Sequence, residues 1–181
     1  MADEGRSLPP VREFADRGVQ WLLETPENVR GLLCVVAADI ARCLDFSRMV
    51  RESATMIPDN LRKQEADLVF RVPYREGAQE REVMVYVLIE HQSSPDPAMG
   101  FRVLFYMVNL WDRQRRAWQE EGLPEGRWRF LPILPVVLYT GGPRWEMPLD
   151  LAALMELPEA LSRFVPRHET LLLSLKATPA E

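Results

Sequence analysis

The sequence has few of the side chains that build structural metal centres or disulfide scaffolds. His91 and His168 are its only histidines and Cys34 and Cys43 its only cysteines, so we expect no structural zinc site. Nine residues apart on one helix, the two thiols would lie about 180° around it and ~13 Å along it, where no disulfide forms. We therefore expect both cysteines to be small buried side chains.

Long apolar runs and excess positive charge are also missing. Stretches such as "VMVYVLI" are far shorter than the ~20 residues of a membrane span, and "MADEGRSLPP" lacks the order of a secretory signal. These features predict a cytoplasmic protein with no membrane partner. The net charge of −5 argues against a nonspecific nucleic-acid coat, but it does not exclude a nuclease with a metal in an acidic cleft.

What is present is an ordinary globular composition. The chain has 181 residues, of which 47% are hydrophobic and 27% charged, enough for one domain with a real core. We predict a disordered tail over residues 1–8, a single domain over 9–181, and a central core over about 45–145.

The order of expected elements indicates an α/β fold. The stretch Thr25-Pro26-Glu27 is typical of a helix start. The apolar residues that recur at helical spacing after it predict a helix that extends to Leu44. Further strands are predicted at 46–51, 67–74, 81–91, 130–140 and 169–175, with a helix over about 98–118. The two strands at 67–74 and 81–91 would form an antiparallel hairpin.

The helix that begins near Asp96-Pro97 has two distinct sides. Its predicted inner stripe is apolar, and its other side is a polar, basic ridge that includes Arg102, Tyr106 and Arg113. The ridge is either a solvated face or a surface for nucleic acid. The inner stripe consists of Phe101, Leu104, Phe105, Val108 and Trp111.

Two carboxylates fall at neighbouring strand ends. Asp67 begins one hairpin strand and Glu90 lies near the end of its partner, so both side chains are expected at the same edge of the sheet. A hard divalent cation would be stabilised between them, because uncompensated carboxylates at that spacing repel. The alternative is that each acid simply ends a strand in solvent.

Three stretches in this order, "EADLVFRV", "EHQSSPDPAMGFR" and "LPILPVVLYTGG", resemble the recombination-promoting nuclease and putative transposase family of the PD-(D/E)XK superfamily. The resemblance implies a restriction-endonuclease-like αβββαβ core, with a mixed central sheet flanked by helices. It also implies a metal-dependent DNA endonuclease that uses Mg²⁺, or Mn²⁺ in its place, and is linked to recombination or transposition. A homodimer is one assembly that the fold allows, since two strands need two cuts.

Site roles follow from the same resemblance. Asp67 and Glu90 would hold the metal with the main-chain carbonyl of His91, and Gln92 would orient the attacking water. The superfamily pattern has lysine where this chain has Gln92, and an amide cannot supply lysine's positive charge. Lys63 and Arg102 are candidates for that charge, and Arg102, Tyr106 and Arg113 are candidate contacts to the DNA backbone.

A rival hypothesis remains open. Gln92 in place of lysine and the acidic net charge are also compatible with a catalytically inactive, nuclease-like module that binds DNA or protein. An unrelated α/β binding protein is a third reading. A titration with Mn²⁺ or Mg²⁺ distinguishes the two hypotheses: thermal stability should rise if the protein has a metal site, and no shift would favour the inactive module.

Overall fold

A computed structural model describes residues 18–52, 68–75 and 83–175, with side chains described for these residues except 83–88. The predicted tail at residues 1–8, Lys63 and Asp67 therefore lie outside the described residues.

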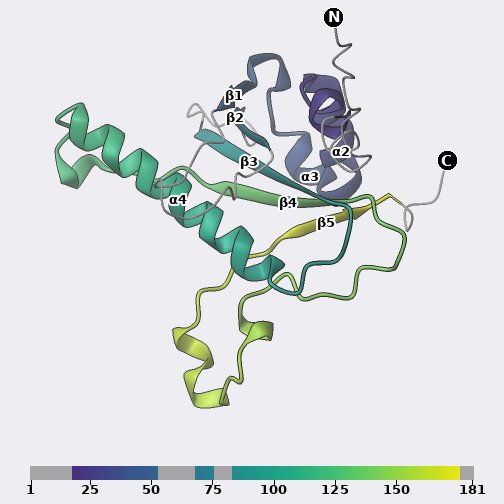
Figure 1. Cartoon of the computed structure of the whole chain (residues 1–181). Coiled ribbons are helices and arrows are strands. Elements are labelled where there is room, and N and C mark those ends of the chain that lie inside the picture. The colour runs from purple at the N-terminus through teal and green to yellow at the C-terminus, as the bar shows by residue number, and fades with distance from the viewer. Residues whose placement is uncertain (1–17, 53–67, 76–82, 176–181) are drawn as a thin grey trace, which may run out of the picture.

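The core of the fold is a five-stranded mixed sheet (Figure 1). Its strands lie side by side in chain order. The first three pair antiparallel and the last three pair parallel, which confirms the predicted αβββαβ arrangement with a mixed sheet. The strands are β1 (Val50–Glu52), β2 (Leu68–Tyr74), β3 (Val83–Gln92), β4 (Ile133–Tyr139) and β5 (Leu171–Ser174).

The helix predicted from Pro26 to Leu44 is interrupted. α2 (Pro26–Val36) starts after Thr25 as expected, but Ala37 has φ −155° and ψ 61°, outside the helical range, and α3 (Ala38–Ala41) follows it. The expectation of two buried cysteines was wrong, because Cys34 is exposed and Cys43 is only partly buried. Cys34 lies beside the buried Leu33, and 100° of helical rotation carries it off the face that packs on the sheet.

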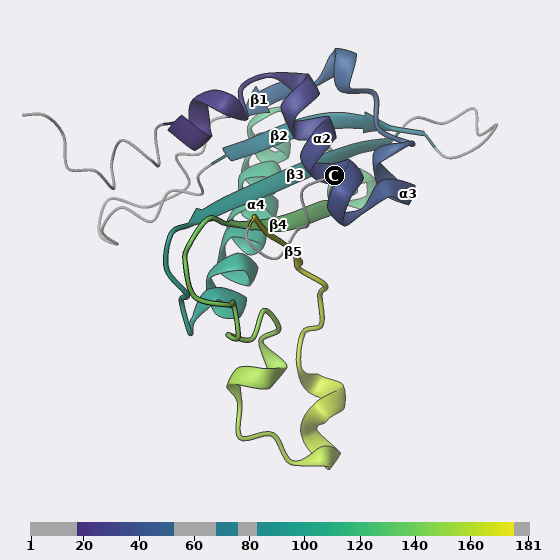
Figure 2. The same cartoon turned by 90° about the vertical axis from the view of Figure 1, so that its right-hand side faces the viewer.

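α4 (Met99–Glu120) connects β3 to β4 and covers the opposite face of the sheet from α2 (Figure 2). The predicted inner stripe was wrong for Phe101 and Val108, which are 54% and 51% exposed, whereas Phe105 and Trp111 are partly buried against the sheet side. The helix carries two adjacent apolar stripes, and periodicity alone does not say which one faces the sheet. The buried side consists of Met99, Gly100, Val103, Tyr106, Met107, Leu110 and Gln114.

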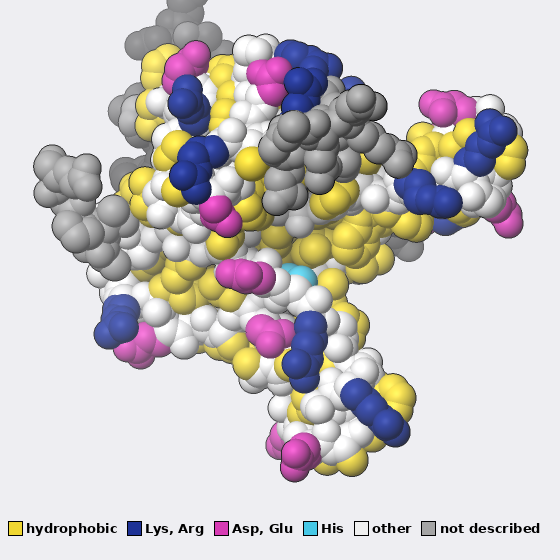
Figure 3. All heavy atoms as spheres, turned by 180° about the vertical axis from the view of Figure 1, so that it is seen from behind, with side chains coloured by type: hydrophobic (Ala, Val, Ile, Leu, Met, Phe, Trp, Pro, Cys, Tyr) yellow, Lys and Arg dark blue, Asp and Glu magenta, His cyan; other side chains and the backbone are white. Residues whose placement is uncertain are grey.

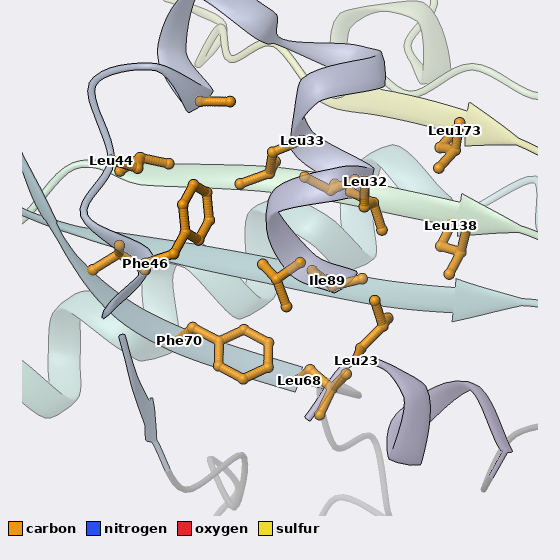
Figure 4. Close-up of a cluster of buried hydrophobic side chains, with 14 residues drawn as sticks. Leu23, Leu32, Leu33, Leu44, Phe46, Leu68, Phe70, Ile89, Leu138 and Leu173 are labelled. Carbon is orange, nitrogen blue, oxygen red and sulfur yellow. The ribbon is translucent and has the colours of Figure 1, made fainter. Parts of the chain in front are cut away.

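Two hydrophobic clusters stabilise the two faces of the sheet. The α2-side cluster (Figure 4) consists of Leu23, Val29, Leu32, Leu33, Ala41, Leu44, Phe46, Leu68, Phe70, Val72, Ile89, Val136, Leu138 and Leu173. The α4-side cluster consists of Val69, Met99, Val103, Tyr106, Met107, Leu110, Val137, Tyr139 and Trp145. Successive strand residues alternate between the clusters, as the pleat requires.

Two parts of the molecule project from this sandwich. One is the far end of α4, and the other is an arm between β4 and β5 that contains short 3₁₀ turns at Ala152–Leu154 and Glu159–Phe164 (Figure 1). Hydrophobic side chains are visible at the surface between the two projections (Figure 3). Within the described ranges, no helix combines the length and the apolar character needed to span a bilayer.

Candidate active site

Glu90 is an acid buried inside the protein. It lies near the end of β3 and is 2% exposed. Ile89 belongs to the α2-side cluster, so strand alternation directs Glu90 and Gln92 to the α4 side. A buried carboxylate needs a cation or several hydrogen bonds to offset the loss of water.

Arg102 provides the positive charge beside Glu90. Its Nη2 donates to Glu90 Oε1, while its Nη1 donates to Asp96 Oδ2 at 2.6 Å. The guanidinium therefore contacts two carboxylates through two different nitrogens, and its side chain is 22% exposed.

The electrostatics of Arg102 reflect this arrangement. Burial lowers its pKa, but the hydrogen bond to Asp96, the charge of Glu90 and the interaction with Tyr106 outweigh burial. The net result is a pKa raised above the ordinary arginine value, so the guanidinium stays protonated at neutral pH.

Gln92 lies on the same side as Glu90. Its Nε2 donates to Glu90 Oε1 at 3.1 Å, so the two predicted catalytic residues are in direct contact. Arg102, not Gln92, brings a positive charge to this carboxylate within the described residues.

His91 faces the other side of the sheet. Its Nε2 is 2.8 Å from Thr140 Oγ1, on the α2 side. The carbonyl of Gln92 accepts from the Thr140 N–H at 2.9 Å, towards β4. Because successive carbonyls along a strand point in opposite directions, the His91 carbonyl points towards β2. The sequence assigned a role to this carbonyl and none to the imidazole.

Asp67, the other predicted metal ligand, cannot be placed because it lies outside the described residues. The described ladder between β2 and β3 ends at the Leu68–Ile89 pair, one residue short of both Asp67 and Glu90 in sequence. Within the described part of the chain, no group of three or more His, Cys, Asp or Glu side chains is gathered as a metal cage.

The three predicted DNA contacts are in different environments. Tyr106 is 0% exposed, and its hydroxyl lies 3.4 Å from Arg102 Nη2, so it supports Arg102 from inside the protein. Arg113 lies further along α4, with its Nη2 3.6 Å from Glu52 Oε2. In this conformation, Arg102 and Tyr106 are therefore part of the site around Glu90, and Arg113 lies with β1.

Sequence reasoning missed the role of Asp96. The sequence places Asp96 at the start of a helix, and its Oδ1 does accept from the Ala98 N–H at 2.8 Å. Its other oxygen binds Arg102. The signal was available in "DPAMGFR", where an acid precedes an arginine by six residues across a helix start.

Several known proteins are similar to this chain in sequence. Recombination-promoting nuclease RpnD of Escherichia coli O157:H7 is 28% identical over 132 residues, covering 72% of this chain and 46% of RpnD. RpnA of Escherichia coli K12 is 28% identical over 121 residues, which cover 66% of this chain and 37% of RpnA. This chain thus spans less than half the length of either nuclease.

A third relative carries a different description. The "putative inactive recombination-promoting nuclease-like protein YjiP" of Escherichia coli K12 is 32% identical over 87 residues, covering 48% of this chain and 81% of YjiP. No solved structure matches the chain. The family model described as "Putative transposase, YhgA-like" matches residues 15–181. With nearly all of its length matched, this chain belongs to the YhgA-like transposase family, whose relatives here include recombination-promoting nucleases.

Proposed function

We propose that the protein is a metal-dependent DNA endonuclease that hydrolyses phosphodiester bonds in recombination or transposition. The observation that carries the proposal is the buried Glu90 in direct contact with Gln92, one residue beyond the last described pair of the β2–β3 ladder. Membership of a family with relatives named as nucleases supports the same activity.

The donor set fits a hard divalent cation such as Mg²⁺ or Mn²⁺. Glu90 contributes a carboxylate, and the neighbouring His91 carbonyl points towards β2, the strand that Asp67 precedes in sequence. Oxygen ligands of this kind are the ones that Mg²⁺ prefers. Asp67, Glu90 and the His91 carbonyl are the proposed ligands.

Each residue then has a separate task. When bound, the cation would supply Lewis acidity and make hydroxide available near neutral pH. Gln92 orients the attacking water through its amide, which donates and accepts hydrogen bonds but carries no charge. Arg102 supplies positive charge near the phosphate, a role usually filled by lysine in this superfamily.

DNA is the proposed substrate, with phosphate contacts that position the duplex without reading its sequence. Arg113, whose Nη2 lies 3.6 Å from Glu52 Oε2, is the second candidate contact. Its proposed role is to hold the backbone on the α4 side, where Glu90 also faces.

Plasmid nicking in Mg²⁺ tests the activity. Glu90→Gln and Asp67→Asn are expected to abolish nicking, because each removes a proposed ligand charge. Asp112→Asn, an acid on α4 paired with Arg115 and Arg116, is the matched control and keeps the parent rate. A Glu90→Gln protein that nicks as fast as the parent contradicts the proposal.

The inactive module is the second candidate, and its motivation is Gln92 in place of lysine together with one relative, YjiP, that is described as putatively inactive. It predicts that Mn²⁺ leaves the melting temperature unchanged, whereas binding of a cation to the folded state raises it. A folded protein that binds DNA, shows no Mn²⁺-dependent stabilisation and does not nick plasmid is this module.

A further inference from the structure

Arg102 joins two carboxylates that belong to different segments. Glu90 is on β3 and Asp96 is in the turn before α4, and each uses its own guanidinium nitrogen. Asp96 is itself oriented by the Ala98 N–H at 2.8 Å. The contact to Asp96 can therefore persist when the contact to Glu90 is lost.

The contact between Arg102 and Glu90 conflicts with metal binding. Arg102 Nη2 binds Glu90 Oε1, an oxygen of the carboxylate proposed to ligate the cation. A guanidinium and a divalent cation repel each other strongly at contact distances inside a protein, where screening by water is weak. Arginine cannot relieve the conflict by losing its proton.

We propose that Arg102 is a displaceable counter-ion of Glu90 and that Asp96 is the positioning residue that retains the displaced guanidinium at the site. This inference rests on the proposed function, because it assumes that a cation binds Glu90. In the metal-free protein Arg102 offsets the buried charge of Glu90. When a cation enters, Nη1 stays on Asp96 and Nη2 is released towards a phosphate oxygen of DNA.

Tyr106 is a second support for the displaced arginine. Its hydroxyl lies 3.4 Å from Nη2, and its ring centroid lies 6.0 Å from the guanidinium carbon, within the range of a cation–π contact. Tyr106 is fully buried in the α4-side cluster, so packing holds its side chain in place beside the guanidinium.

Calorimetric titration of Mn²⁺ into the full chain, without DNA, tests the displacement. Apparent affinity is reduced by the fraction of molecules in which the site is blocked, so Arg102→Gln is expected to tighten Mn²⁺ binding about tenfold. The same variant is expected to nick plasmid more slowly at saturating Mn²⁺, because the phosphate contact is lost. Unchanged or weaker Mn²⁺ binding overturns the displacement.

Two further variants control this titration. Arg102→Lys keeps the charge but cannot bind both carboxylates through separate nitrogens, and it is expected to bind Mn²⁺ more tightly than the parent and less tightly than Arg102→Gln. It decides the question if Arg102→Gln does not fold, since parent-like affinity in the lysine variant contradicts the displacement. Arg115→Gln removes an arginine paired with Asp112 on the same helix and is expected to leave Mn²⁺ affinity unchanged.

The role of Asp96 requires a double-mutant cycle. Asp96→Asn is expected to weaken Mn²⁺ binding severalfold in the parent, because the displaced arginine then has no carboxylate to hold it. The same change in the Arg102→Gln background is expected to have no effect. If Asp96→Asn weakens Mn²⁺ binding equally in both backgrounds, Asp96 acts on the cation through its negative charge alone. That result overturns the positioning role.

Failure of the proposed function gives a different result. If the parent and Glu90→Gln show the same Mn²⁺ titration, the carboxylate is not a ligand and both proposals fail. If Glu90→Gln loses binding but Arg102→Gln resembles the parent, the metal site stands and only the displacement is wrong.

Discussion

The two faces of the sheet differ in chemistry although the same strands build both. On the α2 side, adjacent strands contribute Phe70, Ile89 and Leu138 to an apolar cluster. On the α4 side, an apolar cluster borders the ion pair between Glu90 and Arg102. Ile89 and Glu90 are neighbours in β3, yet Ile89 packs in the apolar cluster and Glu90 forms an ion pair on the opposite face.

We therefore expect substitutions in the α2-side cluster to affect mainly stability, and substitutions around Glu90 on the α4 side to affect mainly the proposed activity. The α2-side cluster stabilises the fold because its apolar side chains are removed from water, and this contribution does not depend on charged groups. The α4 side gives up part of that gain to keep charged groups buried, which natural proteins tolerate where function requires it. Mutations on the two faces should therefore separate loss of folding from loss of activity.

The largest expected effect on stability is on the α2 side. Phe70→Ala should lower the free energy of unfolding by about 3–5 kcal/mol, because it leaves a cavity in a fully buried cluster. Urea denaturation measures the loss. Plasmid nicking per folded molecule should stay at the parent level, and a selective loss of nicking would break the comparison.

Val69→Ala is a smaller deletion at the neighbouring position on the α4 side. Val69 is adjacent to Phe70 in β2 and equally buried, but it packs with α4. Removing its two methyl groups should cost about 2 kcal/mol in urea denaturation. A cost larger than that of Phe70→Ala would mean that the α4 side is the more important for folding.

Glu90→Gln should affect activity more than folding. It breaks the pair with Arg102, but Asp96 still neutralises the guanidinium, so we expect a loss of about 2 kcal/mol, below the range for an isolated buried charge. Nicking and Mn²⁺ binding should both be lost while the circular dichroism spectrum is kept. Retained Mn²⁺ binding would remove the carboxylate from the site.

Thr140→Val sharpens the contrast between adjacent residues of β3. It removes the hydroxyl 2.8 Å from His91 Nε2 on the α2 side, at an expected cost of about 1 kcal/mol in thermal or urea unfolding. Because the imidazole faces away from Glu90, Mn²⁺ affinity should not change. A large loss of Mn²⁺ affinity would indicate that the two faces are coupled through β3.

The smallest effect is expected at the outer surface of α4. Arg116 is 63% exposed and pairs with Asp112 at 2.6 Å, so Arg116→Ala should change stability by less than about 0.5 kcal/mol. Urea denaturation in low and high salt is the measurement. A larger, salt-independent loss would mean that α4 is stabilised by its outer surface as well as by the sheet.

Much of the architecture could be predicted from local pattern. β2, β3, β4 and β5 were each expected within a few residues, because β-branched runs bounded by turn residues are strong signals. The inner side of α4 was not predicted. Tyr106 was counted as polar, whereas the structure buries its ring against the sheet and leaves Phe101 exposed.

The candidate site shows the same division. Glu90 and Gln92, two residues apart on a strand, had to share a face, and the structure brings them into contact. Asp67 lies outside the described residues, so its part in the site stays a prediction. The link between Arg102 and Asp96 could not be derived, because it depends on how α4 starts relative to β3.

The sequence by itself determined the order of elements, the alternation along each strand and the acid near the end of β3, since these depend on residues close together in the chain. Only the tertiary structure decided which side of α4 packs against the sheet and that Arg102 is a basic side chain that pairs with Glu90. Those outcomes depend on the packing of a helix against a sheet, where several side chains of similar polarity compete for the same buried position and geometry selects among them.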